Sequence, residues 1–399
     1  MKIHWLSNAP WAPTGYGNQT KVFLSRLKDA GHEMSATAFY GLEAAVLNLN
    51  GIKVYPRGDQ GFGQDIASAN AALEEADIII SLMDAWVCNP NQLQHNNNRW
   101  VPWFPVDSEP LPAIIRDKVS GAYKRIVFSH FAERMLEQAG LDYYYVPHGV
   151  DTKIFTPQDR DEARKIVGLP KDVYVVGMVA ANKGYPSRKA FCEQIAAFQT
   201  LKKVDSNAVM YLHTRDGING VHQSINLPEF LEGLELEIGK DVYICDQHYY
   251  RTGLFGEDYM INAYSAMDVL LNVSTGEGFG IPIVEAQACG TPVIVGDWTA
   301  MSELCFSGRK VKKENAAPQY TALAAYQFVP RLEDIAALLL AEYKMPSSRT
   351  KAREGALAYD ADLVTEKYWK PVLEDIQINL KEHILLDPEF VIDTSEVTE

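Results

Sequence analysis

The sequence predicts an α/β fold made of two doubly wound parallel sheets that face a central cleft. The first observation is that short apolar runs alternate with amphipathic stretches from residue 2 to residue 146. The second is that a stretch rich in proline, glycine and charge interrupts this pattern at residues 147–164. The third is that the alternation restarts and continues to Val295. Strands that alternate with helices are typical of parallel sheets covered on both faces, so two alternating halves predict two such units.

Five apolar runs in the first half predict strands, with an amphipathic helix after the first of them. The run Ile78–Ile80 is continuously apolar, which is typical of a strand buried on both faces of its sheet. Residues Thr20–Lys28 carry apolar side chains at helical spacing and are followed by Gly31, a common helix end. The predicted strands are Lys2–Leu6, Met34–Tyr40, Asp77–Leu82, Arg125–Phe128 and Tyr143–Val146.

The interruption between the two halves predicts a linker. It contains Pro147, His148, Gly149 and Pro157, followed by the charged stretch Gln158–Arg164. Proline and glycine interrupt regular elements, and charged side chains favour solvent. We therefore expect this segment to connect two domains.

The second half repeats the alternation and ends in a helical segment. After Leu332 the spacing of apolar residues predicts helices, and Pro371 is expected to kink or divide the one at Val364–Ile376. The predicted strands are Val173–Val179, Ala208–His213, Val242–Cys245, Val269–Val273 and Val293–Val295, and the predicted helices before Leu332 are Ala190–Lys202, Asp258–Ala266 and Ile283–Ala288.

The composition is that of a globular protein. The 399 residues suffice for two domains, and 47% hydrophobic with 22% charged residues exclude a disordered chain. The formal net charge of −15 disfavours a broad nucleic-acid or anionic-membrane surface, so a nucleic-acid partner is possible but not favoured. Since no apolar run approaches the ~18–20 residues that span a bilayer, we expect no stable membrane insertion.

Cysteine usage and the N-terminal residues predict a cytoplasmic location. The five cysteines are widely scattered, in neither a disulfide framework nor a metal site. Residues Met1–Ser7 enter a strand-like pattern directly, without the features of a signal peptide. We therefore expect a reduced, cytoplasmic protein.

The most informative segment runs from Ser274 to Val293, S-T-G-E-G-F-G-I-P-I-V-E-A-Q-A-C-G-T-P-V, directly after a predicted buried strand. Ligands bind at this edge of open α/β sheets. The glycines let a ligand approach the backbone, and the helix start at Pro282 favours an anion such as a diphosphate. Glu277 and Glu285 can each accept hydrogen bonds from vicinal hydroxyl groups.

This segment resembles the signature of the family-four retaining glycosyltransferases, in which two glutamates are separated by seven residues. The match covers the pattern E-G-F-G-x-P-x-x-E-A-x-A-x-G-x-P-V, with Glu277 and Glu285 at the two acidic positions. The resemblance implies that Glu277 acts in catalysis and holds the donor sugar together with the backbone of Gly278, Phe279 and Gly280. It implies that Glu285 binds the nucleotide ribose.

The resemblance extends over nearly the whole chain and implies a GT-B fold with two Rossmann-like domains. Residues 1–155, completed by C-terminal helices at about 362–399 that cross back, correspond to an N-terminal acceptor domain. Residues 166–361 correspond to a C-terminal domain that binds the nucleotide-sugar donor. The stretch V-P-H-G-V-D at Val146–Asp151 is similar to the family's interdomain turn, with His148 in place of the usual asparagine.

A basic pair is expected to bind the donor diphosphate. Residues 177–191 resemble the family's strand–loop–helix that supplies it, and Arg188 with Lys189 takes that position, with Lys183 as a substitute. The arginine that many members carry directly after the strand glycine is replaced by Met178. Fixed cations beside a leaving diphosphate lower the barrier to its departure, so we assign Arg188 and Lys189 to catalysis.

Near the N-terminus, the segment P-T-G-Y-G-N-Q-T resembles the family's glycine loop, which faces the acceptor and the donor phosphate. We expect its glycines, Gly15 and Gly17, to line the cleft on the donor side.

Three further polar residues are expected at the ends of strands, near the cleft. Asp107 stands where many members carry a histidine, and we assign it to catalysis, with turn formation as the alternative. Asp84 follows a predicted strand and its role is left open, as is that of the aromatic segment Trp86–Asp107. His213 ends a strand and is assigned to donor binding.

The resemblance implies retaining transfer of a hexose from a nucleotide-diphosphate sugar to an acceptor hydroxyl. A UDP-sugar such as UDP-glucose is favoured as donor and a GDP-sugar is possible. The family works without a metal or another cofactor, and we discount Asp360-x-Asp362 as a metal motif because residues two apart on a helix point in different directions.

Two alternatives to a transferase remain at this point. One is a nucleotide-sugar epimerase or hydrolase of the same architecture, and the other is a non-catalytic nucleotide-sugar binding protein. The acceptor also stays open among a polysaccharide or other glycan, a lipid-linked sugar, a small molecule, a protein and a modified DNA base, and the net negative charge argues modestly against DNA. The linkage formed and the oligomeric state are open as well.

Overall fold

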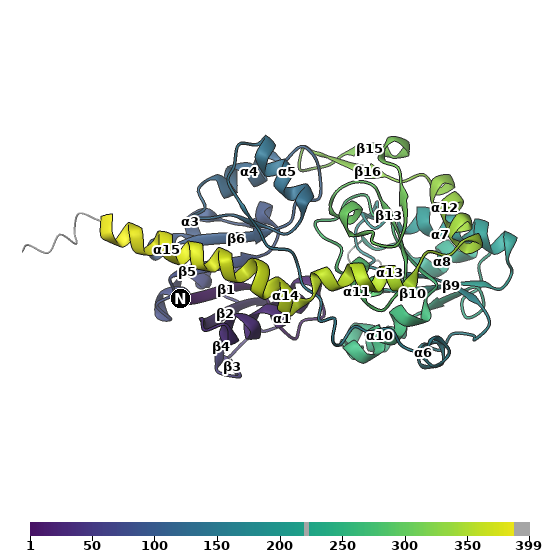
Figure 1. Ribbon diagram of the computed structural model, residues 1–399, viewed down its shortest axis with the longest axis horizontal. Helices are drawn as coiled ribbons and strands as arrows, with labels where there is room; N and C mark the ends of the chain where they lie inside the picture. The colour runs from purple at the N-terminus through teal and green to yellow at the C-terminus, as the bar shows by residue number, and fades with distance from the viewer. Residues whose placement is uncertain (219–222, 387–399) are drawn as a thin grey trace, which may run out of the picture.

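The computed structural model describes residues 1–218 and 223–386, which form two lobes, each built around its own sheet (Figure 1). Helices lie on both sides of the strands in each lobe (Figure 1). This arrangement confirms the α/β class and the two doubly wound units that the sequence predicts.

The N-terminal lobe contains an eight-stranded sheet, parallel except for the antiparallel pair at one edge. In order across the sheet the strands are β3 (Leu47–Leu49), β4 (Ile52–Pro56), β2 (Glu33–Tyr40), β1 (Lys2–Asn8), β5 (Ile78–Leu82), β6 (Trp100–Phe104), β7 (Ile126–Val127) and β8 (Tyr144–Tyr145). The helices are α1 (Gly15–Asp29), α2 (Gln64–Leu73), α3 (Pro90–Leu93), α4 (Ala113–Ser120) and α5 (His130–Gln138), with 3₁₀ turns at Ala85–Val87 and His95–Asn97.

The C-terminal lobe contains a six-stranded, fully parallel sheet. In order across the sheet the strands are β11 (Val242–Ile244), β10 (Ala208–His213), β9 (Tyr174–Val179), β12 (Val269–Asn272), β13 (Val293–Gly296) and β14 (Gly308–Val311). The helices are α6 (Arg160–Val167), α7 (Phe191–Val204), α8 (Leu227–Gly233), α9 (Gln247–Thr252), α10 (Glu257–Ala266), α11 (Ile281–Ala288), α12 (Leu332–Lys344) and α13 (Arg349–Ala356), with 3₁₀ turns at Ala300–Leu304, Lys313–Asn315 and Leu357–Tyr359.

Every strand that the sequence predicts is present, with each end within two residues of the expected position. In the two large sheets, the strands β3, β4, β6 and β14 were not predicted. In β6, Pro102 argues against a central strand because it cannot donate to the sheet, yet it pairs with Ser81 of β5. Strand β14 was missed because its residues Arg309 and Lys310 are charged, which is atypical of a buried strand. It lies at the edge of the sheet, with β13 as its one neighbour.

The charged stretch Gln158–Arg164 is wrongly predicted as linker, because most of it belongs to helix α6. The side chain of Asp159 caps the helix by accepting hydrogen bonds from the backbone N–H groups of Asp161 and Glu162, both 3.0 Å away. Gly168 ends the helix in the left-handed conformation. The buried residues Ala163 and Arg164 give α6 the inward face that a linker would lack.

A two-stranded antiparallel hairpin, β15 (Ala317–Tyr320) and β16 (Tyr326–Val329), connects the C-terminal lobe to the other lobe. The backbone N–H of Glu109 donates to the Tyr326 carbonyl at 3.0 Å, and the Tyr326 N–H donates to the Glu109 carbonyl at 2.7 Å. This hairpin was not predicted, because short exposed strands have only a weak pattern of apolar residues.

The chain returns to the N-terminal lobe through α14 (Ala361–Val364), a π-helical segment (Thr365–Trp369) and α15 (Lys370–Leu386). Figure 1 shows α15 running along the N-terminal lobe, as the predicted crossing helices require. The π segment stands directly before Pro371, where the sequence predicts a kink or division. Residues 387–399 of the predicted crossing segment lie outside the described residues.

The crossing is fixed by Trp369, which is fully buried among aromatic rings of the N-terminal lobe. Its ring centroid lies 4.9 Å from that of Trp103, 5.8 Å from Phe23 and 6.0 Å from Trp5. Offset and edge-to-face aromatic pairs at these distances stabilise a core beyond the burial of their area.

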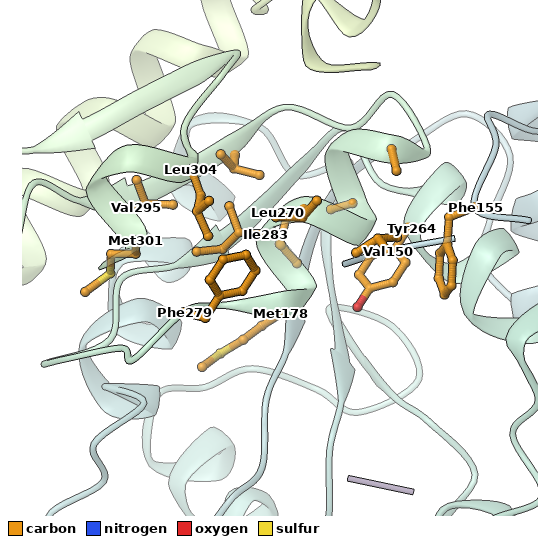
Figure 2. Packing of buried hydrophobic residues seen from close by; sticks show 14 of the residues in the cluster. Val150, Phe155, Met178, Tyr264, Leu270, Phe279, Ile283, Val295, Met301 and Leu304 are labelled. Atoms are coloured by element: carbon orange, nitrogen blue, oxygen red, sulfur yellow. The ribbon is translucent and has the colours of Figure 1, made fainter. Parts of the chain in front are cut away.

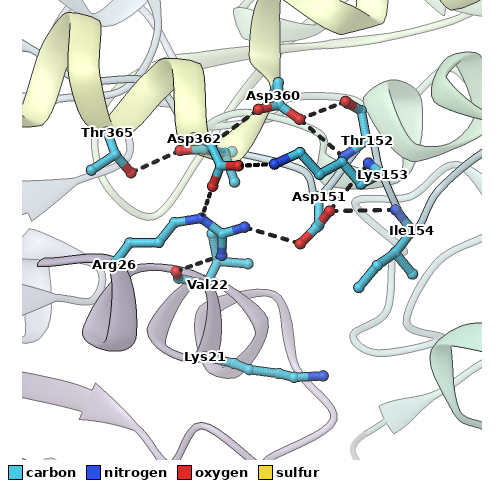
Figure 3. A network of polar contacts seen from close by, with 12 residues as sticks. Lys21, Val22, Arg26, Asp151, Thr152, Lys153, Ile154, Asp360, Asp362 and Thr365 are labelled. Carbon is cyan, nitrogen blue, oxygen red and sulfur yellow. Dashed lines mark hydrogen bonds and ion pairs between the residues drawn. The ribbon is translucent and has the colours of Figure 1, made fainter. Parts of the chain in front are cut away.

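Charged groups reinforce the same crossing (Figure 3). Arg26 of α1 donates to Asp362 at 2.7 Å and to Asp151 of the interdomain turn at 2.9 Å. The Thr152 hydroxyl donates to Asp360 at 2.5 Å. Both aspartates of the Asp360-x-Asp362 pattern are therefore engaged in joining the C-terminal segment to the rest of the chain.

Candidate active site

The segment with the two glutamates forms a loop between β12 and α11, at the carboxyl edge of the C-terminal sheet. Gly280 precedes the first turn of α11 with a φ of 113°, a value that L side chains rarely adopt, and Pro282 lies within that first turn. The loop faces the N-terminal lobe. We call residues Ser274–Gly280 the donor loop.

Glu277 is the centre of a buried charge cluster. Its side chain is 5% exposed and forms an ion pair with Lys189, while Arg188 Nη1 lies 3.6 Å from its second carboxylate oxygen. The Ser274 hydroxyl donates to Glu277 at 2.6 Å, and the Glu277 backbone N–H donates to the Thr299 hydroxyl at 3.1 Å. These contacts hold the carboxylate in one position.

The cluster keeps Glu277 ionised. Burial alone would raise the pKa of Glu277, but the opposite charges of Lys189 and Arg188 outweigh it, so the pKa lies below its ordinary value. Burial lowers the pKa of Lys189, and the attraction of Glu277 opposes that shift. The pKa of Arg188 is raised because its carboxylate neighbours outweigh the effect of its burial.

Asp107 of the N-terminal lobe joins this cluster from across the cleft. Its carboxylate lies 3.5 Å from Arg188 Nη1, so one guanidinium faces Glu277 on its own lobe and Asp107 on the other. The basic pair and the two carboxylates that the sequence analysis assigned to catalysis thus lie together, although Asp107 is 170 positions from Glu277 in the sequence.

The donor loop lies directly against the N-terminal lobe at two glycines. A Cβ atom on Gly276 would stand 2.2 Å from the carbonyl oxygen of Asp107. A Cβ atom on Gly278 would stand 2.4 Å from Pro105 Cβ. Real Cβ contacts are never so short, so only glycine permits the two lobes to approach this closely.

A second helix begins opposite the donor loop. The Thr14 hydroxyl accepts a hydrogen bond from the Gly17 backbone N–H at 3.0 Å and thereby caps α1. A Cβ on Gly15 would stand 3.5 Å from Ile281 at the start of α11. The first turns of α1 and α11 therefore face each other across the cleft, and both present free N–H groups.

Glu285 lies in the second turn of α11, outside the charge cluster around Glu277. The Tyr264 hydroxyl donates to its carboxylate at 2.6 Å. Burial raises the pKa of Glu285 to about 7. A carboxyl group poised in this way changes its charge near neutral pH.

Phe279 is placed by the structure in the joint between the lobes. Its ring is 3% exposed and belongs to the buried cluster drawn in Figure 2, which also contains Ile283. Across the joint it meets His148 at 5.1 Å and Phe128 at 6.2 Å between ring centroids. The side chain of Phe279 is therefore part of the packing between the lobes, and the backbone role in donor binding that the resemblance implies stays a prediction.

His213 occupies an aromatic enclosure at the end of β10. Its Nδ1 lies 3.0 Å from the Tyr211 hydroxyl, and the ring of Phe255 lies 5.0 Å away. Burial lowers the pKa of His213 to about 4, so the ring is neutral at physiological pH. No contact joins it to the charge cluster among the described residues.

Sequence reasoning missed Tyr16, which stands between Gly15 and Gly17 in the first turn of α1. Its hydroxyl donates to Asp84 at 3.2 Å. Burial raises the pKa of Asp84, the charge of Asp107 adds to the effect, and Arg188 opposes it. The prediction for this loop relied on its two glycines and did not consider the hydroxyl group of the tyrosine between them.

Sequence reasoning also missed Gln327 of β16, which contacts both sides of the cleft. Its amide oxygen accepts a hydrogen bond from the Thr275 hydroxyl at 3.0 Å, and its amide nitrogen lies 3.4 Å from the Asp107 carbonyl. No motif marks this residue, because it comes from the hairpin that the sequence did not predict.

Within residues 1–218 and 223–386, no group of three or more His, Cys, Asp and Glu side chains is arranged to hold a metal ion. Over the same part of the chain, no helix combines the length and the apolar character needed to cross a bilayer.

The donor-loop region matches a known family. Residues 175–326 match the family model described as Glycosyl transferases group 1. A D-inositol 3-phosphate glycosyltransferase of Mycolicibacterium smegmatis is 30% identical over 190 residues, which are 46% of this chain and 40% of that protein. One from Stackebrandtia nassauensis is 30% identical over 148 residues, 37% of this chain and 32% of that protein. The chain thus spans less than half of the length of these relatives.

Solved structures resemble the whole chain. Sucrose-phosphate synthase from Thermosynechococcus elongatus has a TM-score of 0.68 at 16% identity, covering 96% of this chain and 99% of that one. The Anabaena protein HepE in complex with UDP-glucose has a TM-score of 0.67 at 17% identity, covering 94% and 100%. These likenesses confirm the GT-B fold that the sequence resemblance implied.

Proposed function

We propose that this chain, a member of the family-four glycosyltransferases, transfers a hexose from a nucleotide-diphosphate sugar to an acceptor hydroxyl with retention of the anomeric configuration. A UDP-sugar is the favoured donor, and a GDP-sugar is the second candidate. The observation that carries the proposal is the buried cluster of Glu277, Arg188 and Lys189 beside the N-terminus of α11. The neighbour HepE, whose structure contains UDP-glucose, supports the choice of donor.

In this proposal the donor diphosphate lies between the two facing helix starts. Arg188 and Lys189 supply fixed positive charge there, and the free N–H groups of α11 and α1 add partial positive charge. As the bond between the sugar and the diphosphate breaks, negative charge grows on the leaving group. Cations already fixed in place stabilise that charge without rearrangement, so no metal ion is needed.

The sugar itself is oriented by the donor loop. Glu277 is ionised and held by Ser274, so it can accept hydrogen bonds from sugar hydroxyl groups. Glu285 can accept hydrogen bonds from the ribose. The contacts of Gly276 and Gly278 with the N-terminal lobe exclude water when the lobes close, which favours transfer over hydrolysis of the donor.

A thermal-shift series tests the donor. UDP, GDP, UDP-glucose and GDP-mannose are added separately to the full chain, and the nucleotide that raises the melting temperature identifies the base. Incubation with the matching labelled nucleotide sugar, in the presence of EDTA, then shows whether the sugar is released or transferred without a metal. The absence of a shift with all four compounds would rule out the proposal.

The products separate the three candidate activities. Conversion of the donor sugar alone into its epimer, or release of free sugar as the sole product with every acceptor, indicates the epimerase or hydrolase. Binding without turnover indicates a nucleotide-sugar binding protein. Transfer with the anomeric configuration of the donor, read from the coupling constant of the anomeric proton, is the expected result.

A further inference from the structure

We propose that Glu303 is a positioning residue of the transfer reaction, which binds the start of helix α5 in the opposite lobe and thereby fixes Glu277 when the cleft is closed. The inference rests on the proposed function and adds to it a residue that acts through Glu277 rather than on the substrate. Sequence reasoning gave Glu303 no role, and it stands outside the charge cluster around Glu277.

Glu303 joins the two lobes through its carboxylate. It belongs to the 3₁₀ turn Ala300–Leu304 of the C-terminal lobe, and its two oxygens accept hydrogen bonds from the backbone N–H groups of His130 at 2.9 Å and Phe131 at 3.2 Å. These are the first two residues of α5 in the N-terminal lobe. The first N–H groups of a helix have no partner inside it, and the helix dipole favours a negative charge there. Glu303 therefore completes the cap of a helix that belongs to the other lobe.

The contact is favourable only in the closed arrangement. Burial raises the pKa of Glu303, while the hydrogen bonds from α5 and the basic side chains of His130 and Arg134 oppose that shift. A carboxyl group that is taken out of water costs free energy unless it is hydrogen-bonded. The buried position of Glu303 is thus tolerated while α5 supplies the two donors, and it becomes unfavourable when the lobes are displaced against each other.

The turn that carries Glu303 also holds the backbone of Glu277. The Thr299 hydroxyl, directly before the turn, accepts a hydrogen bond from the Glu277 N–H at 3.1 Å, and the Ala300 N–H donates to the Glu277 carbonyl at 3.3 Å. Both backbone polar groups of Glu277 are therefore bound by this one segment. A shift of the turn would move the carboxylate that faces Lys189.

The segment and the donor loop are packed as one body. Met301 and Leu304 are fully buried and belong to the same cluster as Phe279 of the donor loop (Figure 2). The ring N–H of Trp298 donates to the carbonyl oxygen of Ser274 at 3.0 Å. Because these contacts leave little freedom between the two segments, the position of the turn against α5 is passed on to the donor loop.

The backbone of Thr299 supports this view independently. Its φ of 50° and ψ of −158° fall in a region that is adopted almost only by glycine, and the residue is 3% exposed. A residue other than glycine stays in such a conformation only where the surrounding contacts impose it. We take the strain as a sign that the turn is fitted between Glu277 on one side and α5 on the other.

Two variants remove the contact from its two sides. Glu303→Ala removes both acceptor oxygens, and His130→Pro removes one of the donor N–H groups. Proline is favoured at the first helical position, and Ser129 has the extended conformation that is required before a proline, with φ −140° and ψ 148°, so α5 should remain intact. His130→Ala is the matched control, because it loses the same side chain, which is 53% exposed, but keeps the N–H group.

The first measurement is small-angle X-ray scattering of the full chain without a nucleotide. We expect a larger radius of gyration for Glu303→Ala and His130→Pro than for the wild type, and no difference between His130→Ala and the wild type. This comparison does not depend on any donor, so it tests the contact even if the proposed function fails. Equal radii in all four proteins would overturn the role of Glu303 in closure.

The second measurement separates positioning from binding. Turnover is followed as UDP released from labelled UDP-glucose with water as the acceptor, or as GDP from GDP-mannose if that nucleotide binds, because departure of the diphosphate needs Glu277 in place whichever hydroxyl attacks. In Glu303→Ala we expect kcat to fall about tenfold or more, since a small misplacement of a catalytic group is costly, while the Kd for the nucleotide changes less than about threefold.

The combined variant Glu303→Ala/His130→Pro completes the test. Both substitutions remove the same contact, so the pair should lose no more activity than Glu303→Ala alone. Additive losses, or an affinity for the nucleotide that falls as much as kcat, would show a merely structural role and contradict the proposal. Absence of nucleotide binding by the wild-type protein would instead count against the proposed function itself.

Discussion

The two lobes share one type of fold, but candidate binding residues can be inferred from the sequence of one lobe much more directly than from that of the other. After the function proposed for them, we call the C-terminal lobe the donor lobe and the N-terminal lobe the acceptor lobe. The family match at residues 175–326 lies entirely within the donor lobe. The cleft is also asymmetric in charge, because the donor lobe contributes Arg188 and Lys189 together with Glu277, while the acceptor lobe contributes the acidic side chains of Asp84 and Asp107. The cations of the cluster therefore lie on one wall of the cleft, and the opposite wall carries acidic side chains.

The difference teaches that a site can be recognised from sequence when it is built from backbone and local spacing. A diphosphate and a ribose have fixed sizes, so a loop and helix that bind them need glycines and acids at fixed intervals, and the spacing of Glu277 and Glu285 matches such a pattern. The opposite wall is assembled from Tyr16 in the first turn of α1, Asp84 after β5 and Asp107 after β6. No fixed spacing in the sequence indicates that these three residues lie together.

The largest effect is expected from Trp369→Ala, which tests whether the two lobes also differ in stability. Trp369 follows the donor lobe in sequence but is buried among rings of the acceptor lobe. Truncation of a buried tryptophan should lower the free energy of unfolding of the acceptor lobe by about 3–5 kcal/mol. Calorimetry should reveal an earlier transition that UDP does not move and a later one that UDP raises.

The control for this experiment is Leu363→Ala, which alters a 43% exposed side chain on the same crossing segment. We expect its free energy of unfolding to stay within about 0.5 kcal/mol of wild type. If Trp369→Ala instead lowers both transitions equally, the lobes unfold as one unit and the contrast between them does not extend to stability.

The next largest effect concerns the donor wall. Glu277→Gln keeps the size of the side chain but removes the charge that faces Lys189 and Arg188. We expect kcat for transfer to fall about 10²–10³-fold, the usual cost of losing one fixed electrostatic group in an active site. Initial rates with the labelled donor measure the loss. Glu314→Gln is the control. The Glu314 side chain belongs to the same lobe and is 73% exposed, so its substitution should leave the rate unchanged.

Much of the fold was predictable because its strands are buried and its helices amphipathic. Strand β5, for example, has all five residues buried, and four of the five are apolar, so its sequence is readily recognised as a strand. Strand β6 was missed for a physical reason, since Pro102 breaks a local rule that tertiary pairing then overrides. Helix α6 was missed because its exposed face carries most of its charges.

The candidate site was predictable in its donor half only. Glu277, Arg188 and Lys189 lie together as expected, and Asp107 joins them through Arg188. Tyr16 was not found because one tyrosine between two glycines has no periodicity to reveal it. The same holds for residues that meet only through tertiary structure, because a single sequence does not record which loops become neighbours.

A smaller effect is expected from the pH dependence of donor binding. Burial raises the pKa of Glu285 to about 7, and only the ionised carboxylate accepts hydrogen bonds at both oxygens. The affinity for UDP-glucose should therefore rise about tenfold as the pH increases from about 6 to 8. Isothermal titration at several pH values measures this change. Glu285→Gln should bind more weakly and with little pH dependence, whereas an unchanged slope would assign the titration to another group.

The smallest effect tests how the two walls are held together. Lys313, which precedes the hairpin β15–β16, forms an ion pair with Glu109 of the acceptor lobe, and both side chains are partly exposed, at 41% and 29%. Water and salt screen such a pair, so it should contribute less than about 1 kcal/mol to closure of the lobes. In Lys313→Ala we expect about a twofold rise in the fraction of donor lost to hydrolysis, with the difference shrinking at high salt.

Lys312→Ala is the matched control, because Lys312 pairs with Glu314 within its own lobe at 3.3 Å. Equal hydrolysis in the two variants would mean that the backbone bridge between Glu109 and Tyr326 holds the walls together without help from this charge.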